Sequence, residues 1–183
     1  MPAKIFRAYN GASGSLAATS VMSTQSTSSS ANLTRTMLQI APSSTAPSIR
    51  VIGWGYAFAA PPAANVVMDL VDSGAIFASS LTAHVAAGIQ RMNGPAAEQS
   101  SVQLGTALTG YCTTAAGTPS TEGTYTASTT RLLDSRFENG LSFYWRFELG
   151  REPEIPVGNC LRLRATPTSA AALALHCWID WEE

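Results

Sequence analysis

The sequence is poor in charge, and acidic residues are missing from one whole stretch. Charged residues make up 13% of the 183 positions, and residues 1–68 contain four basic side chains but no aspartate or glutamate. The net charge of −1 and the pI near 6.1 exclude a strongly basic nucleic-acid-binding protein. The uneven distribution indicates either contact with an acidic partner or only that a Ser/Thr-rich stretch carries few charges.

Long apolar runs and paired cysteines are also missing. No segment approaches the roughly 20 uncharged apolar residues of a membrane helix, so we expect no membrane association. The first residues lack the apolar core and cleavage site of a signal peptide, so we expect no export by the general secretory route. Cys112, Cys160 and Cys177 are odd in number and contain no CxxC pair, which predicts reduced, mostly buried thiols rather than a disulfide framework or a zinc knuckle.

Residues that could support catalysis are scarce. Of the two histidines, His84 has no Cys or Glu at metal-ligand spacing, and His176 lies in an alternating pattern typical of a surface or interface strand. No P-loop, GxGxxG, HExxH or nucleophile elbow occurs. The acidic pairs at 152 and 154 and at 182 and 183 do not by themselves make a glycosidase or calcium site. We therefore expect no enzyme, no metal and no cofactor.

What the sequence does contain is period-two alternation, the pattern of β-strands. It runs through residues 49–58, 66–71, 141–149, 160–165 and 173–181, with turn signals between the runs. Helical periodicity is weak, with a turn or two at most over residues 80–92. These patterns predict an all-β fold of seven to nine strands, a β-sandwich or jelly-roll-like domain.

The alternation also predicts which side chains face the core. Trp54, Tyr56 and Phe58 share one face and are expected in the core, although a sugar-binding platform would use similar residues. Along residues 141–149 the inward face is predicted to hold Leu141, Phe143, Trp145, Phe147 and Leu149. The outward faces are predicted to hold Arg146, Arg162 and Arg164, either as solvated or salt-bridged side chains or as contacts with an acidic partner.

The N-terminal part differs from the rest in composition. Residues 19–30, TSVMSTQSTSSS, contain nine Ser or Thr in twelve positions and bury too little apolar surface to fold alone. We predict an extended arm over residues 1–33 and a sandwich domain over residues 34–183. The arm is held either by another protein chain or by folding back on its own domain as an edge strand. Its predicted partner-binding anchors are Ile5, Phe6, Arg7 and Tyr9, with Arg35 at its base.

Five segments occur in this order along the chain: RVIGWGYAF at 50–58, TAH at 82–84, NGP at 93–95, LGREPEIPVGNCLRLRA at 149–165 and CWIDWEE at 177–183. Together they resemble structural proteins of tailed phages that infect actinobacteria, of the capsid decoration or cement kind. The resemblance covers about residues 34–183 and leaves out the Ser/Thr-rich arm.

The resemblance implies a β-rich, non-enzymatic virion protein that binds the outside of an icosahedral head and clamps neighbouring capsomers. Its partners would be the major capsid protein and further copies of itself, commonly as a homotrimer, and it would fold in the bacterial cytoplasm. The alternative is another virion component: a head fibre base, a tail component or a lectin-like receptor-binding sandwich.

Overall fold

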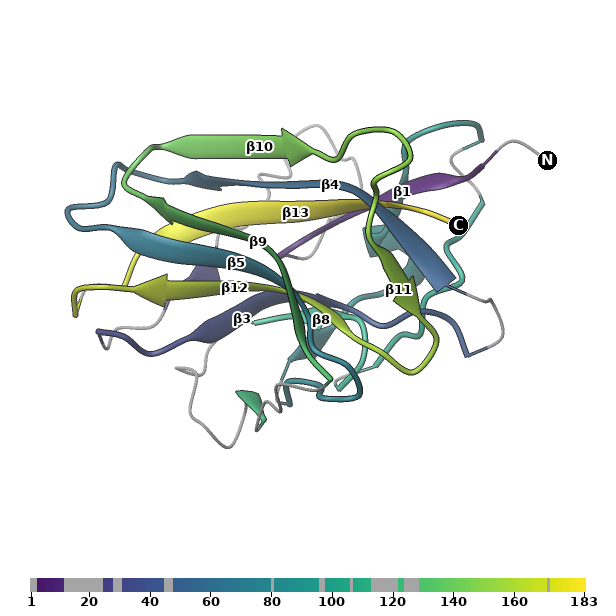
Figure 1. The fold of residues 1–183 in the computed structure, drawn as a ribbon, viewed down its shortest axis with the longest axis horizontal. Coiled ribbons are helices and arrows are strands. Elements are labelled where there is room, and N and C mark those ends of the chain that lie inside the picture. The colour runs from purple at the N-terminus through teal and green to yellow at the C-terminus, as the bar shows by residue number, and fades with distance from the viewer. Residues whose placement is uncertain are drawn as a thin grey trace.

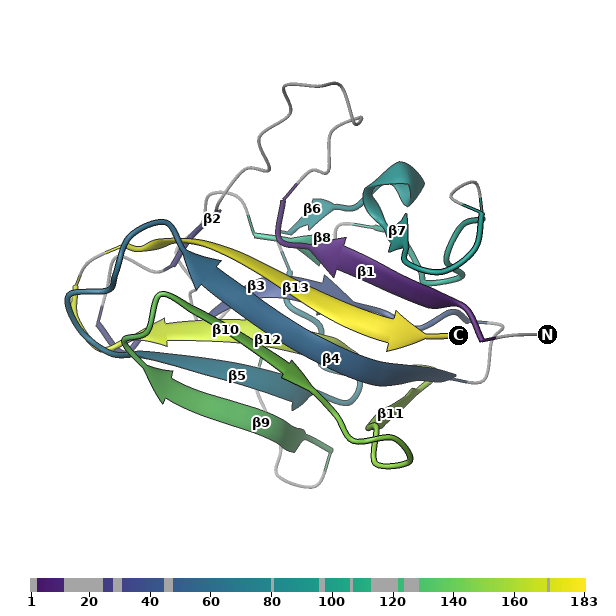
Figure 2. The ribbon, with the colours of Figure 1, turned by 90° about the horizontal axis from the view of Figure 1, so that it is seen from above.

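The computed structural model describes residues 3–11, 25–27, 31–44, 48–79, 81–95, 98–105, 107–112, 122–123, 129–170 and 172–183. Two antiparallel sheets form nearly all of the regular structure and lie against each other as two layers (Figures 1 and 2). A short 3-10 turn, Ala86–Gly88, lies inside the stretch where a turn or two was predicted. The all-β sandwich prediction is therefore confirmed.

The first sheet contains the two longest strands at its centre. Its order is β10 (Ser142–Arg146), β4 (Ser48–Phe58), β13 (Ala174–Glu182), β1 (Ile5–Tyr9) and β7 (Gln90–Arg91). Two short strands also join it: β11 (Glu154–Pro156) pairs with β4, and β2 (Gln25–Ser26) pairs with β13.

The second sheet packs its inner face against the first. Its order is β6 (Thr82–Ala83), β8 (Gly110–Tyr111), β3 (Arg35–Ile40), β12 (Leu161–Pro167), β5 (Val66–Asp72) and β9 (Arg131–Glu138). Strands β9 and β10 follow each other along the chain but belong to different sheets, so the chain crosses from one layer to the other between them (Figure 2).

The predicted core face of β4 is confirmed. On β4, Trp54, Tyr56 and Phe58 are buried and their rings contact one another. Alternate residues on the other central strands are buried in the same way: Val66, Met68, Leu70, Leu161, Leu163, Ala165, Leu175, Cys177, Ile179 and Trp181. Large side chains from both sheets thus fill one continuous core.

The face of β4 that carries Gly53, Gly55 and Ala57 is covered by a tryptophan from β13, its neighbour in the sheet. A Cβ atom added to Gly55 would lie 2.5 Å from Cζ2 of Trp178 and 2.7 Å from the carbonyl oxygen of Phe143. Trp178 is directly opposite Gly55 in the β4–β13 ladder. Glycine is therefore needed here so that the indole of Trp178 can lie against the backbone of β4.

The predicted boundary of the arm at residue 33 is wrong for residues 5–9. These residues form β1, which pairs with β13 on one side and with β7 on the other. Phe6 and Ala8 are completely buried, and the Phe6 ring stacks on that of Trp181 at a centroid distance of 6.1 Å. The alternative, a segment folded back on its own domain, describes β1 correctly. Most of the Ser/Thr-rich run, residues 19–24 and 28–30, lies outside the described residues.

The predicted core strand over residues 141–149 is also corrected. The strand ends at Arg146, and Trp145 is 41% exposed and Leu149 94% exposed, whereas Phe143 and Phe147 are partly buried against the core. Trp145 is exposed because β10 is an edge strand, which has a neighbouring strand on only one side. Alternation identified the strand but not its place in the sheet.

Candidate interaction surface

Exposed apolar side chains gather on one side of the sandwich, formed by β9, β10 and the turns after β10, which we call the β9–β10 side. Of the ten large apolar side chains exposed among the described residues, seven belong to it: Leu132, Phe137, Leu141, Tyr144, Trp145, Leu149 and Val157. Single exposed apolar residues are normal on a protein surface, but a group of them on one side marks an interaction surface.

The same side presents two long strand edges. Strand β10 has five residues and β9 has eight, and among the described residues each pairs with one neighbouring strand only. The opposite margins of the two sheets are the two-residue strands β7 and β6. Very short edge strands protect a sheet from pairing with other chains, so the β9–β10 side is the less protected one.

A groove of about 390 Å³ opens between these two edges. The guanidinium of Arg136 lies over the rings of Phe143 and Trp145, at 4.6 and 5.3 Å from their centroids, in cation–π contact. Its Nη2 is 3.4 Å from Oδ2 of Asp134, which also accepts the indole N–H of Trp54 at 3.1 Å. The groove is lined by Leu133, Asp134, Arg136, Trp145, Phe147, Glu148 and Arg151.

The outer face of the first sheet carries an ion pair between β1 and β13. Nε and Nη2 of Arg7 donate to the two carboxylate oxygens of Asp180 at 2.5 and 2.7 Å, and the Tyr144 hydroxyl lies 3.3 Å from Asp180 Oδ2. The hydrogen bond to Asp180 raises the pKa of Arg7, and burial raises the pKa of Tyr144. Arg7, a predicted partner-binding anchor, is thus paired within its own sheet and holds β1 against β13.

Aromatic rings surround this ion pair. Tyr144 stacks on Trp178 at 6.2 Å, and Tyr9 meets His176 edge-on at 4.9 Å. The guanidinium of Arg7 lies 5.7 Å from the Trp178 ring centroid. Burial, followed by the charge of Arg7, lowers the pKa of His176, so this histidine is held neutral. We call Tyr9, Tyr144, His176 and Trp178 the outer aromatic cluster.

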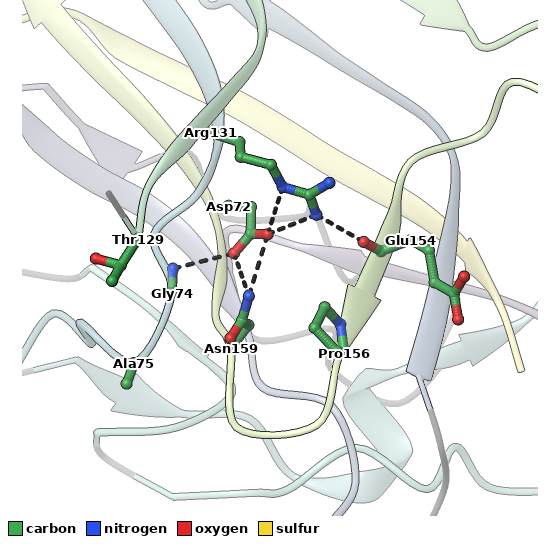
Figure 3. A pocket seen from close by; sticks show the side chains of 8 residues that line it. All are labelled: Asp72, Gly74, Ala75, Thr129, Arg131, Glu154, Pro156 and Asn159. Carbon is green, nitrogen blue, oxygen red and sulfur yellow. Dashed lines mark hydrogen bonds and ion pairs between the residues drawn. The ribbon is translucent and has the colours of Figure 1, made fainter. Parts of the chain in front are cut away.

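A hollow of about 760 Å³ lies at the other end of β9 and is built around Asp72 (Figure 3). The buried Asp72 carboxylate accepts bonds from Arg131 at 2.7 and 3.0 Å, from the Asn159 amide at 3.0 and 3.2 Å and from the Gly74 N–H at 3.0 Å. Arg131 also donates to the Glu154 carbonyl at 2.8 Å. The carboxylate is fully engaged, so the cluster ties β5, β9 and β11 together.

Two of the predicted partner-binding arginines are buried. Arg162 is completely buried, and its guanidinium contacts the Glu122 carboxylate and the Thr36 hydroxyl. Arg35 is 4% exposed, with its Nε 2.8 Å from the Cys112 sulfur. The outward placement of Arg162 is therefore wrong, because the Glu122 carboxylate, 40 residues away in sequence, pairs with its charge inside the domain.

The remaining predicted anchors lie in three different places. Arg164 is part-buried and pairs with Asp69 at 3.2 Å. Arg146 is exposed on β10, as predicted, and is the one predicted arginine that lies on the β9–β10 side. Ile5 is partly buried at the start of β1, where its N–H donates to Asn93 at 2.7 Å. The structure therefore does not gather the predicted anchors into one site.

The cysteines and His84 are enclosed. All three cysteines are buried and form no disulfide, as predicted, and burial raises the pKa of Cys160 to about 12. His84 is 3% exposed beside Tyr111, and burial lowers its pKa to about 4. No group of three or more metal-ligating side chains, and no helix long and apolar enough to cross a membrane, occurs in the described part of the chain.

Sequence reasoning missed the two most exposed apolar residues of β9, Leu132 and Phe137. The only signal was the segment RLLDSRFE, whose alternation is broken by two adjacent leucines.

No protein-family model, curated protein or solved structure matches this chain. The function of the chain is therefore inferred from its sequence and from the surfaces described above.

Proposed function

We propose that this chain is a structural protein of a tailed-phage particle, a decoration protein that binds the outside of the capsid and stabilises contacts between capsomers. The observation that carries the proposal is the β9–β10 side, where exposed apolar residues and two long free strand edges occur together. Surfaces of this kind suit a protein that works inside an assembly. The proposed partners are the major capsid protein and further copies of the chain, with a trimer as the expected oligomer.

The segments behind the sequence resemblance support the proposal through their positions in the fold. RVIGWGYAF lies in β4 and CWIDWEE overlaps β13, the two strands that pair at the centre of the first sheet. Their large side chains build the core. The resemblance thus concerns residues that determine the sandwich, and the proposed role requires no catalysis.

Stabilisation of a shell would follow from mass action. A protein that binds the assembled shell but not free capsid subunits lowers the free energy of the assembled state. The tightly packed sandwich, with its core filled from both sheets, would act as a rigid clamp. The protein would fold in the bacterial cytoplasm, which suits three cysteines that form no disulfide.

The proposal is tested by sedimenting particles from the source culture on a density gradient and quantifying this chain by mass spectrometry. Co-migration with DNA-filled particles, at a copy number comparable to that of the major capsid protein, is the expected result. A chain that stays at the top of the gradient contradicts any virion role. The control is the same gradient after the gene has been deleted.

The outer aromatic cluster favours a second candidate, a lectin-like receptor-binding sandwich of the same particle. Tyr144 is 49% exposed and stacks on Trp178, and exposed rings of this kind can bind sugar faces. A glycan array distinguishes the two roles: sugar binding that is lost in Tyr144→Ala, with copies in the low tens per particle, would favour the lectin. Absence of sugar binding, with a high copy number, favours decoration.

A further inference from the structure

Strand β9 is an edge strand of the second sheet among the described residues. Natural proteins protect such edges with short strands, with lysine or proline, with β-bulges or with inward-pointing charges. The eight residues of β9, RLLDSRFE, include no lysine and no proline, and the strand lies at the margin of the ribbon in Figure 2. Its ladder with β5 contains a bulge and its charged side chains point inward, so a strand that pairs here must match both features. An edge of this length is a template to which another strand can add by backbone hydrogen bonding.

The inner face of β9 carries its charges. In the β5–β9 ladder, Arg136 is opposite the buried Met68 and Asp134 is opposite the buried Leu70. Directly opposed residues of antiparallel strands point to the same face, so both charged side chains point inward. The ladder places two further charges on this face at the ends of the strand: Arg131, opposite Asp72, and Glu138, opposite Val66.

The outer face of β9 is uncharged. Ser135 is opposite Asp69, and its hydroxyl donates to that carboxylate at 2.7 Å. Phe137 and Leu132 lie on the same face, 64% and 63% exposed. The ladder shifts by one residue between Asp134 and Leu132. Leu132 and Phe137 are therefore the same number of ladder positions from Ser135, one on each side.

We infer that two copies of this chain pair through β9, antiparallel, about a two-fold axis at Ser135. With Leu133 bulged out of this new ladder as it is out of the β5–β9 ladder, the register places Phe137 of one copy against Leu132 of the other, so that each covers the other's exposed side chain. It also places opposite charges together at every inner position: Arg136 against Asp134, and Glu138 against Arg131. The second sheet of each copy then continues into that of the other copy.

The strand that pairs with β9 comes from a second copy of this chain, because the edge is complementary to itself in both charge and apolar character. The inference rests on the proposed structural role and deepens it by naming a surface for self-association. A two-fold contact joins two chains only, so on a shell it would link subunits of neighbouring trimers. Opposed charges favour this register over registers that place like charges together.

The contact is tested by sedimentation equilibrium of the full chain at increasing concentration. The trimer is expected only on the shell, so the apparent mass of the free wild type should rise from 19.2 kDa towards twice that value. Phe137→Glu should weaken the dimer about tenfold or more, because it places an unpaired carboxylate in an apolar contact. The matched control is Val85→Glu, at a valine that is 66% exposed outside β9, and it should dimerise like the wild type.

The register is tested by a cysteine crosslink. Two Ser135→Cys chains would have Cα atoms about 4.5 to 5.5 Å apart, within the range of a disulfide. The three native thiols are buried, so oxidation should crosslink Ser135→Cys but not Asn139→Cys, which lies just beyond the end of β9. Circular dichroism confirms that each variant is folded.

A chain that remains monomeric at all concentrations, or an Asn139→Cys variant that crosslinks while Ser135→Cys does not, overturns the inference. These outcomes are separate from those for the proposed function. A monomer that still co-migrates with particles refutes the β9 contact alone, whereas a β9-linked dimer that is absent from particles supports the contact and refutes the virion role.

Discussion

Replacing Phe6 by alanine tests whether β1 is part of the folded domain. The Phe6 side chain is completely buried and packs on Trp181, and its strand has a hydrogen-bonded neighbour on each side. Truncation of a buried phenylalanine to alanine costs about 3 to 5 kcal/mol, from lost burial and from the cavity left behind. Because a domain is stable by only about 5 to 15 kcal/mol, this loss is a large share of the total.

The assay is urea unfolding followed by tryptophan fluorescence. Phe6→Ala should move the unfolding midpoint to a much lower urea concentration with little change in slope. Leu149→Ala is the control, since this leucine is 94% exposed and its truncation should change stability by less than about 0.5 kcal/mol. A loss below about 1 kcal/mol for Phe6→Ala would refute the integration of β1 and restore the arm hypothesis for these residues.

Three further predictions concern buried groups. Burial lowers the pKa of His84 from 6.5 to about 4, so only the unfolded state gains this proton as the pH falls through that range. The free energy of unfolding should therefore fall by about 3 kcal/mol by pH 4, and urea titrations of His84→Leu should lack this part of the pH dependence. Glu122→Gln leaves the Arg162 guanidinium buried without its carboxylate and should cost about 3 kcal/mol in urea unfolding; an unchanged midpoint would contradict the buried pair. Gly55→Ala forces the Trp178 indole off β4 and should cost about 1 to 3 kcal/mol, whereas unchanged thermal unfolding would refute the close approach.

The sequence was most informative where a strand lies in the middle of a sheet. In β4, β12 and β13 the buried residues alternate with small, polar or partly exposed ones, so period two identified both the strand and its core face. In residues 141–149 the same pattern predicted a core strand, but β10 is an edge strand of its sheet. Alternation reports that a strand has two different faces and says nothing about how many neighbours it has.

Long-range pairing explains the other differences. Arg162 is buried because Glu122, 40 residues away, neutralises it, and no local pattern in the sequence marks that pair. The five residues of β1 are stabilised by β13 at the far end of the chain, whereas the polar composition that follows them suggested an arm. The candidate interaction surface was missed as well, since Phe137 and Leu132 lie on the outer face of β9, and no local pattern in the sequence marks that face as uncovered.

The location of the chain on the particle tests the decoration proposal most directly. Purified particles would be treated with an antibody raised against the folded protein and a gold-labelled second antibody, and then viewed by electron microscopy. The account predicts gold over the whole surface of the heads and none on particles from a strain that lacks the gene. Gold confined to tails or to a single vertex, or no label on intact particles, would contradict it.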